Sequence, residues 1–110
     1  MTNKPGSSAA TASVSLQGDT VQVTGPLNFA TVPSVLPQSA QWLGRGLSNL
    51  TVDLTGVPWA DSAGLALLLE WLVQARGKGL SIHYAGIDRQ VAEIIRINGL
   101  QDLIGNNSPS

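Results

Sequence analysis

An aspartate and a serine stand where a buried strand gives way to a helix, and they are the residues best placed for chemistry. The apolar run 50–54 ends at Gly56 and Pro58, which predicts a short strand followed by a turn. Asp61 and Ser62 then precede an apolar run with helical spacing. Both are favourable N-cap residues, because a short side-chain oxygen accepts from backbone N–H groups that the first helical turn leaves unpaired. Ser62 is therefore predicted at the positive end of a helix, where an oxygen, or a phosphate on it, is favoured.

Two interpretations of Ser62 stay open at this point. As a plain N-cap, the serine would contribute about 1 kcal/mol to stability and nothing more. Asp61 could equally be the cap, which would leave Ser62 exposed in the first turn.

Little else in the sequence could do chemistry. The single histidine, His83, is predicted on the outward side of a strand, and no two carboxyl groups are spaced as a general acid and base. The chain has no cysteine, and one histidine alone offers little to a metal ion. The segment 77–79, Gly-Lys-Gly, follows a helix and lacks the spacing of a phosphate-binding loop. We therefore expect no catalytic residue, no metal, no cofactor and no enzymatic activity.

Composition limits the protein to one small domain. The chain has 110 residues, of which 43% are hydrophobic and 12% are charged, and its formal net charge is -1. These values are typical of a globular domain and give no electrostatic reason to expect nucleic acid as a partner. Because no apolar run is long enough to cross a bilayer and the N-terminus has no signal-peptide pattern, we expect a cytoplasmic protein. We predict a domain over 12–104 between polar tails, 1–11 and 105–110.

The order of predicted elements indicates an α/β fold. Strand, strand, helix, strand, helix, strand and helix follow one another, so the second half alternates as parallel crossover connections do. We expect a mixed sheet of about four strands, with an antiparallel hairpin at one edge and helices mainly on one face. The first half is predicted to hold a hairpin around 17–20 and an irregular helix within 31–46, closed by Gly44 or Gly46. After the strand and helix described above, we expect a strand over 80–84, a helix capped by Asp88, and an apolar turn over 100–104.

The helix after Ser62 is predicted to be amphipathic, with Leu67 and Trp71 together on its outer face. At 100° per residue its core face is predicted to hold Leu65, Leu68, Leu69, Leu72 and Ala75. A solvent-exposed Trp beside a Leu would be a candidate protein-binding patch, unless an adjoining helix of the same domain covers it. The opposite face, where that patch would lie, holds Ala63, Leu67, Glu70, Trp71 and Gln74.

The run 57–69, Val-Pro-Trp-Ala-Asp-Ser-Ala-Gly-Leu-Ala-Leu-Leu-Leu, resembles the signature of STAS domains. This fold is shared by anti-sigma factor antagonists and the C-terminal domains of sulfate transporters. The resemblance extends through 77–79 and 94–100 and covers roughly 13–104. Within the family, the run 61–71 is most similar to the MlaB type. That type is the small STAS subunit of the ABC complex that moves phospholipids between the inner and outer membranes of Gram-negative bacteria.

The resemblance gives Ser62 one of two roles. It falls where the antagonists carry a phosphorylated serine, and where the transporter subunit has a hydroxyl residue in contact with the ATPase. Two departures disfavour the antagonist. Ala63 replaces a second hydroxyl residue, and the turn 25–28, Gly-Pro-Leu-Asn, replaces an acidic Gly-Glu-Leu-Asp type turn.

The resemblance thus implies a non-enzymatic STAS subunit that binds, and stabilises or regulates, the ATPase of a phospholipid ABC transporter. Its partners would include a permease and a substrate-binding subunit, and it would meet the inner membrane only through them. The alternative is an anti-sigma factor antagonist whose Ser62 is phosphorylated by a partner serine kinase. The residues expected at the interface are Ser62, Asp61, Ala63, Leu67, Glu70, Trp71 and Gln74, with Trp59 and Pro58 as secondary contacts.

Overall fold

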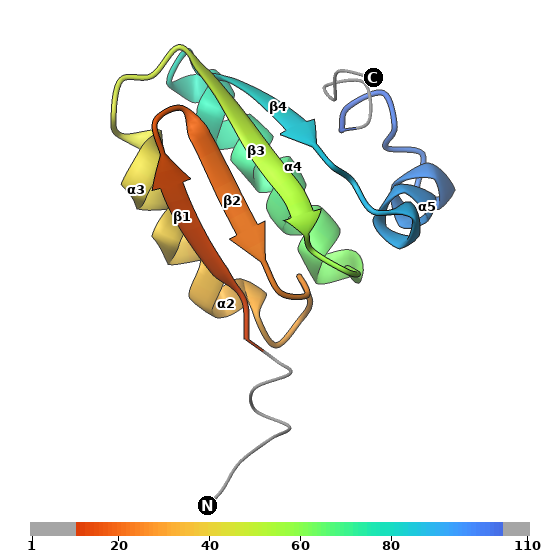
Figure 1. Cartoon of the computed structure of the whole chain (residues 1–110). Coiled ribbons are helices and arrows are strands. Elements are labelled where there is room, and N and C mark those ends of the chain that lie inside the picture. The colour runs from red at the N-terminus through yellow and green to blue at the C-terminus, as the bar shows by residue number, and fades with distance from the viewer. Residues whose placement is uncertain (1–10, 105–110) are drawn as a thin grey trace, which may run out of the picture.

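Four strands form one sheet in the computed structural model of the chain, which describes residues 11–104 (Figure 1). The predicted tails therefore lie outside the described residues, except for Thr11. The elements in chain order are β1 (Ser13–Gln17), β2 (Thr20–Thr24), α2 (Val32–Val35), a 3-10 helix (Leu36–Ser39), α3 (Ala40–Leu43), β3 (Asn49–Gly56), α4 (Ser62–Gly77), β4 (Ser81–Ala85) and α5 (Arg89–Ile97).

The sheet is mixed, as the sequence predicts. Its strand order is β1-β2-β3-β4, with β1 antiparallel to β2 and the pairs β2·β3 and β3·β4 parallel. Gly18, in the hairpin turn, has a φ of +64°, a left-handed conformation that glycine adopts without steric cost. Because β2, β3 and β4 run in the same direction, their carboxyl ends meet at one edge of the sheet, the lower edge in Figure 1.

The two faces of the sheet differ sharply in polarity. Helices α2, α3 and α4 cover one face, as predicted (Figure 1). Side chains that point toward them are buried, whereas those that alternate with them are mostly polar and exposed, including His83. The buried set in β2, β3 and β4 comprises Val21, Val23, Leu50, Val52, Leu54, Ile82 and Tyr84.

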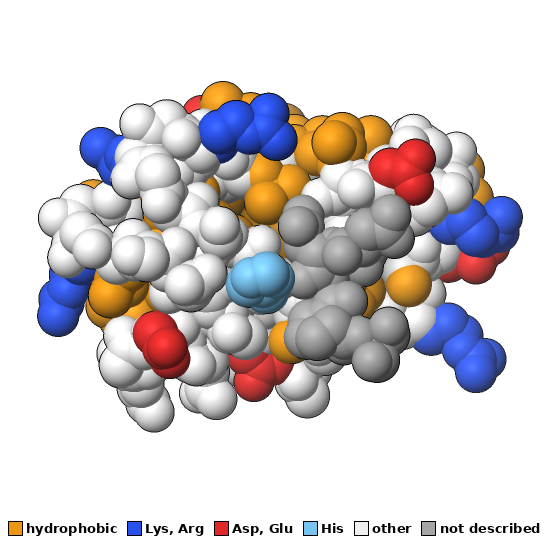
Figure 2. Space-filling model, turned by 90° about the horizontal axis from the view of Figure 1, so that it is seen from above, with side chains coloured by type: hydrophobic (Ala, Val, Ile, Leu, Met, Phe, Trp, Pro, Cys, Tyr) orange, Lys and Arg blue, Asp and Glu red, His pale blue; other side chains and the backbone are white. Residues whose placement is uncertain are grey.

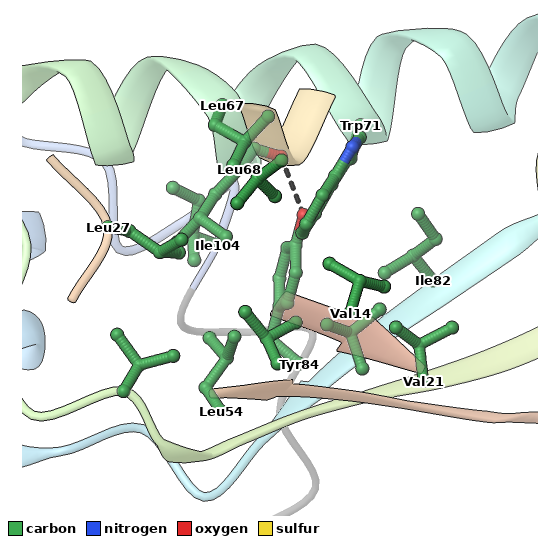
Figure 3. Close-up of a cluster of buried hydrophobic side chains, with 14 of the residues drawn as sticks. Val14, Val21, Leu27, Leu54, Leu67, Leu68, Trp71, Ile82, Tyr84 and Ile104 are labelled. Carbon is green, nitrogen blue, oxygen red and sulfur yellow. Dashed lines mark hydrogen bonds between the residues drawn. The ribbon is translucent and has the colours of Figure 1, made fainter. Parts of the chain in front are cut away.

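A buried hydrogen bond fixes α4 to the sheet. The Tyr84 hydroxyl donates to the Leu68 carbonyl at 2.7 Å, and both residues lie within the apolar core (Figure 3). Burial raises the pKa of the Tyr84 hydroxyl well above its usual value, so that this group stays protonated and remains a donor.

The prediction that Leu67 and Trp71 face solvent is wrong. Leu67 is 2% exposed and Trp71 is 0% exposed. Trp71 packs edge-on against Trp42 of α3, with ring centroids 5.2 Å apart and ring planes at 77°. The adjoining helix of the same domain therefore covers this face, which was the alternative interpretation.

Helix α4 is buried on two sides because it packs on the sheet and also against the segment 32–43, which lies beside it on the same face (Figure 1). Its apolar residues consequently surround most of the axis and form no single stripe. Leu69 and Leu72, which the periodicity assigned to the core face, are only partly buried at the edge of the core. The segment 32–43 is irregular, as Pro33 and Pro37 predicted, and it ends before Gly44.

Substitutions of Trp42 test whether packing or hydrogen bonding stabilises the contact between α3 and α4. The Nε1 atoms of Trp42 and Trp71 are buried without a hydrogen-bond partner among the described residues. Trp42→Ala should lower the free energy of unfolding by about 3–5 kcal/mol, because it leaves a cavity against α4. Trp42→Phe should cost less than half as much, because it keeps an aromatic ring and removes an N–H that has no acceptor. Urea denaturation would measure both losses, and equal losses would contradict this account.

Candidate functional site

The loops after β2 and β3 stay paired beyond the ends of their strands. The Leu27 N–H donates to the Trp59 carbonyl at 3.1 Å, and the Asp61 N–H donates to the Leu27 carbonyl at 3.1 Å. Leu27 and Ala60 thus form an isolated parallel bridge. This pairing holds the two loops side by side at the carboxyl edge of the sheet, where α4 begins (Figure 1).

Gly64 allows the first turn of α4 to approach this bridge. A Cβ atom at position 64 would lie 2.3 Å from the Leu27 carbonyl oxygen and 2.9 Å from the Leu27 Cβ. Neither atom is at the end of a flexible side chain, so any residue with a Cβ would push the helix away. The glycine in the run Asp-Ser-Ala-Gly is therefore a requirement of close packing.

Asp61 accepts three backbone hydrogen bonds from two segments. Its Oδ1 accepts from the N–H groups of Ala63 at 2.9 Å and Gly64 at 3.2 Å, which makes Asp61 the N-cap of α4. Its Oδ2 accepts from the Phe29 N–H at 3.0 Å. One carboxylate therefore satisfies the start of the helix and attaches the turn that follows β2.

Ser62 is the first residue of α4, and its side chain is exposed. Because Asp61 is the cap, the second of the two interpretations of this pair is confirmed. The Ser62 hydroxyl lies at the positive end of a 16-residue helix, where a negatively charged group is stabilised. The position is suited to a modification or a partner contact.

The turn that Asp61 attaches is ordered by its own side chains. Asn28 Oδ1 accepts from the N–H groups of Ala30 at 2.8 Å and Thr31 at 3.1 Å. The Thr31 hydroxyl accepts from the Asn28 N–H at 2.9 Å and donates to the Pro26 carbonyl at 2.8 Å. This turn therefore has a defined conformation before any partner binds.

Two aromatic side chains are exposed on these loops. Trp59, which was expected to be a secondary contact, is 42% exposed, and the adjacent Pro58 is exposed as well. Phe29 is 82% exposed, and nothing in the sequence motifs pointed to a role for it. No local pattern in the sequence indicated that the aromatic residue of this turn points outward.

Helix α5 also supports the loop before α4. The Gln90 side chain accepts from the Ala60 N–H at 3.0 Å and donates to the Ala60 carbonyl at 3.4 Å. Asp88 caps α5 by accepting from the Gln90 N–H at 3.0 Å, as predicted. The starts of α4 and α5 therefore both lie against the same loop.

The residues expected at the interface do not form one surface. Those in the loop and first turn, from Pro58 to Ala63, lie together. Glu70 and Gln74 lie about two turns or more further along α4, where the Gln74 amide donates to the Glu70 carboxylate at 2.7 Å. Leu67 and Trp71 lie inside the core, so a partner cannot contact them without unfolding the domain.

The described residues offer little else at this site for catalysis. No group of three His, Asp or Glu side chains within 11–104 could hold a metal ion. Asp53 lies on the open face of the sheet, and the Thr55 hydroxyl and then the Thr55 N–H lower the pKa of its carboxyl group by donating to it. That carboxylate is therefore ionised at neutral pH and is a poor proton donor.

A separate groove of about 700 Å³ lies at the other end of α4. It is lined by the C-terminal half of α4, by Gly79 and Leu80, by the first residues of β4, and by Leu103. Figure 2 shows this end of the molecule, where hydrophobic side chains are exposed near the histidine. Because Ser62 is at the opposite end of the helix, the groove is not part of the candidate site.

Comparison with known families identifies the domain. The family model described as "Mlab, STAS domain" matches residues 10–105, which is most of the chain. The chain belongs to the STAS domain family. An anti-sigma-B factor antagonist of Staphylococcus epidermidis is 28% identical over 87 residues, which cover 79% of this chain and 81% of that protein.

Solved structures match the fold of this STAS domain. A Thermotoga maritima protein assigned as an anti-sigma factor antagonist superposes with a TM-score of 0.70 at 16% identity, over 83% of this chain and 80% of that one. The murine anion transporter Solute Carrier 26 family member A9 gives 0.68 at 23% identity, over 86% of this chain but 16% of the transporter. No helix within residues 11–104 has both the length and the apolar character needed to cross a bilayer.

The close approach at Gly64 can be tested with a matched pair of alanine substitutions. Gly64→Ala should destabilise the domain by about 1–3 kcal/mol, because the new methyl group meets backbone that cannot move aside. Gly77→Ala, in the last turn of the same helix, meets nothing within 4 Å. It should leave stability unchanged or raise it by up to about 1 kcal/mol. Thermal melts followed by circular dichroism would measure both, and a Gly64→Ala variant as stable as Gly77→Ala would disprove the close packing.

Proposed function

We propose that this STAS domain is a non-enzymatic protein-binding switch of the anti-sigma factor antagonist type, phosphorylated on Ser62 by a partner serine kinase. The observation that carries the proposal is the arrangement of Asp61 and Ser62. Asp61 supplies the cap that the helix needs, so the Ser62 hydroxyl is exposed and is not required as the N-cap.

A phosphate on Ser62 would change the contact surface strongly. It would bring a charge of about -1.5 to -2 to the first turn of α4. The positive end of the helix favours that charge, whereas the neighbouring Asp61 carboxylate opposes it. A partner that packs against the unmodified serine would have to desolvate the phosphate, so phosphorylation should release it.

The similarity to staphylococcal anti-sigma-B factor antagonists supports this function more than the transporter role that the sequence motifs first suggested. The turn 25–28 still lacks an acidic residue, and Ala63 still replaces a hydroxyl residue. We therefore propose a kinase that recognises a neutral turn beside Ser62.

A second candidate is the STAS subunit of a phospholipid ABC transporter. The description of the matching family model and the uncharged turn favour it. In that role Ser62 would contact the ATPase subunit directly, on the cytoplasmic side of the inner membrane, in a complex with a permease and a substrate-binding subunit. Both candidates use the same exposed start of α4.

Phosphate incorporation and co-purification separate the two functions. The tagged chain, expressed in its own host, should recover a soluble serine kinase, and with ATP that kinase should phosphorylate the wild-type chain but not Ser62→Ala. Ser62→Asp should reduce kinase recovery, because its carboxylate imitates part of the added charge. Ser48→Ala and Ser48→Asp, which alter another exposed serine, are matched controls and should behave as the wild type.

Two results would contradict the antagonist function. One is equal phosphate incorporation in the wild type and Ser62→Ala. The other is recovery of an ABC ATPase with its permease and without a kinase, lost in Ser62→Asp, which would establish the second candidate instead.

A further inference from the structure

Phe29 is the most exposed large hydrophobic side chain among the described residues, at 82%. A single exposed apolar residue is ordinary on a protein surface, so exposure alone indicates nothing. The position and the rigidity of Phe29 are what set it apart from Ile97 and Val73, which are 68% and 66% exposed on helices α5 and α4.

The backbone of Phe29 is held from both sides. Its N–H donates to Asp61, and the flanking Asn28 and Thr31 close the turn with their own side chains. Asn28 is 9% exposed and Thr31 is 1% exposed, so the side chains that close the turn are buried although the phenyl ring of Phe29 is not. An aromatic ring that projects from an ordered backbone loses little conformational entropy when it binds.

Phe29 also lies beside Ser62. The two residues lie on either side of Asp61. The Phe29 backbone nitrogen donates to Asp61 Oδ2 at 3.0 Å, and Ser62 directly follows Asp61 in the chain. Both follow parallel strands that end at the lower edge of the sheet in Figure 1. A partner that covers Ser62 would therefore meet Phe29 as well.

Few charges lie around this pair. The Asp61 carboxylate is half-buried and both its oxygens accept from backbone N–H groups, and the neighbouring start of α5 carries one acidic and one basic residue, Asp88 and Arg89. A complementary partner surface should thus be mainly apolar and should not be acidic. The exposed side chains on the loops and the first turns of α4 are Ala30, Pro58, Trp59, Ser62 and Ala66.

We propose that Phe29 is the aromatic anchor of the Ser62 surface and inserts into an apolar pocket of a partner protein. This inference rests on the proposed function, in which a protein partner covers Ser62. Aromatic residues near the centre of an interface often carry much of its binding energy. A phosphate on Ser62 would then release the partner, because it would place a charge at the edge of an apolar interface from which water is excluded.

The test combines site-specific photo-crosslinking with affinity measurements. The full chain is expressed in its own host with p-benzoylphenylalanine at position 29 or, as a control, at the similarly exposed position 97, and crosslinked proteins are identified by mass spectrometry. Affinity for the crosslinked protein is then measured for Phe29→Ser, Ile97→Ser and Ser62→Asp at low and high NaCl. Circular dichroism should show all three variants folded, since each altered side chain is exposed.

The expected result is a crosslink from position 29 to one protein and none to that protein from position 97. Phe29→Ser should weaken binding about tenfold or more, Ile97→Ser should change it less than about twofold, and salt should have little effect.

Wild-type affinity of Phe29→Ser, together with weak binding of Ser62→Asp, would overturn the role of Phe29 and leave the proposed function standing. Wild-type affinity of both would overturn the two proposals together. Binding of the wild type, but not Phe29→Ser, to phosphatidylethanolamine–phosphatidylglycerol vesicles would assign Phe29 to a membrane and overturn the inference.

Discussion

The Asp61 carboxylate is the interaction on which the candidate site depends. It satisfies two of the unpaired N–H groups at the start of α4 and a third on the turn that follows β2. A hydrogen bond to an ionised acceptor is stronger than one between neutral groups, and an N-cap of this kind contributes about 1 kcal/mol. Because the same group serves both segments, the position of Ser62 relative to Phe29 is set by the fold and not by a partner.

A second constraint supports the first. Gly64 and the bridge between Leu27 and Ala60 bring the start of α4 against the sheet edge, and the packing of Trp71 against Trp42 anchors the middle of the same helix. Helix α4 is therefore fixed at its start by the sheet edge and near its middle by α3. The exposed hydroxyl of Ser62 stands on a rigid support, which suits either a kinase that must recognise it or an ATPase that must pack against it.

The sequence was sufficient for the features that local chemistry decides. The hairpin, the strand and turn before α4, the cap at Asp88, and the alternation that exposes His83 each follow from a few adjacent residues, whereas the choice between Asp61 and Ser62 as the cap of α4 needed the structure. It was insufficient where a distant segment decides. Leu67 and Trp71 have the spacing of an outer face, and only the irregular segment 32–43, whose broken periodicity hid its role as a cover, places them inside. Phe29 is the converse case, since an apolar residue is ordinarily assigned to a core and nothing local marks it as exposed.

Amide hydrogen exchange of Asp61→Ala, measured by NMR, would show whether the Asp61 carboxylate holds both the start of α4 and the turn after β2. If one carboxylate holds both segments, the amides of Phe29, Ala63 and Gly64 should all exchange faster in this variant, while those of the β2 and β3 ladder keep their protection. Unchanged protection of the Phe29 amide, with faster exchange only at Ala63 and Gly64, would show that Asp61 is a helix cap alone and that the turn is held by other contacts.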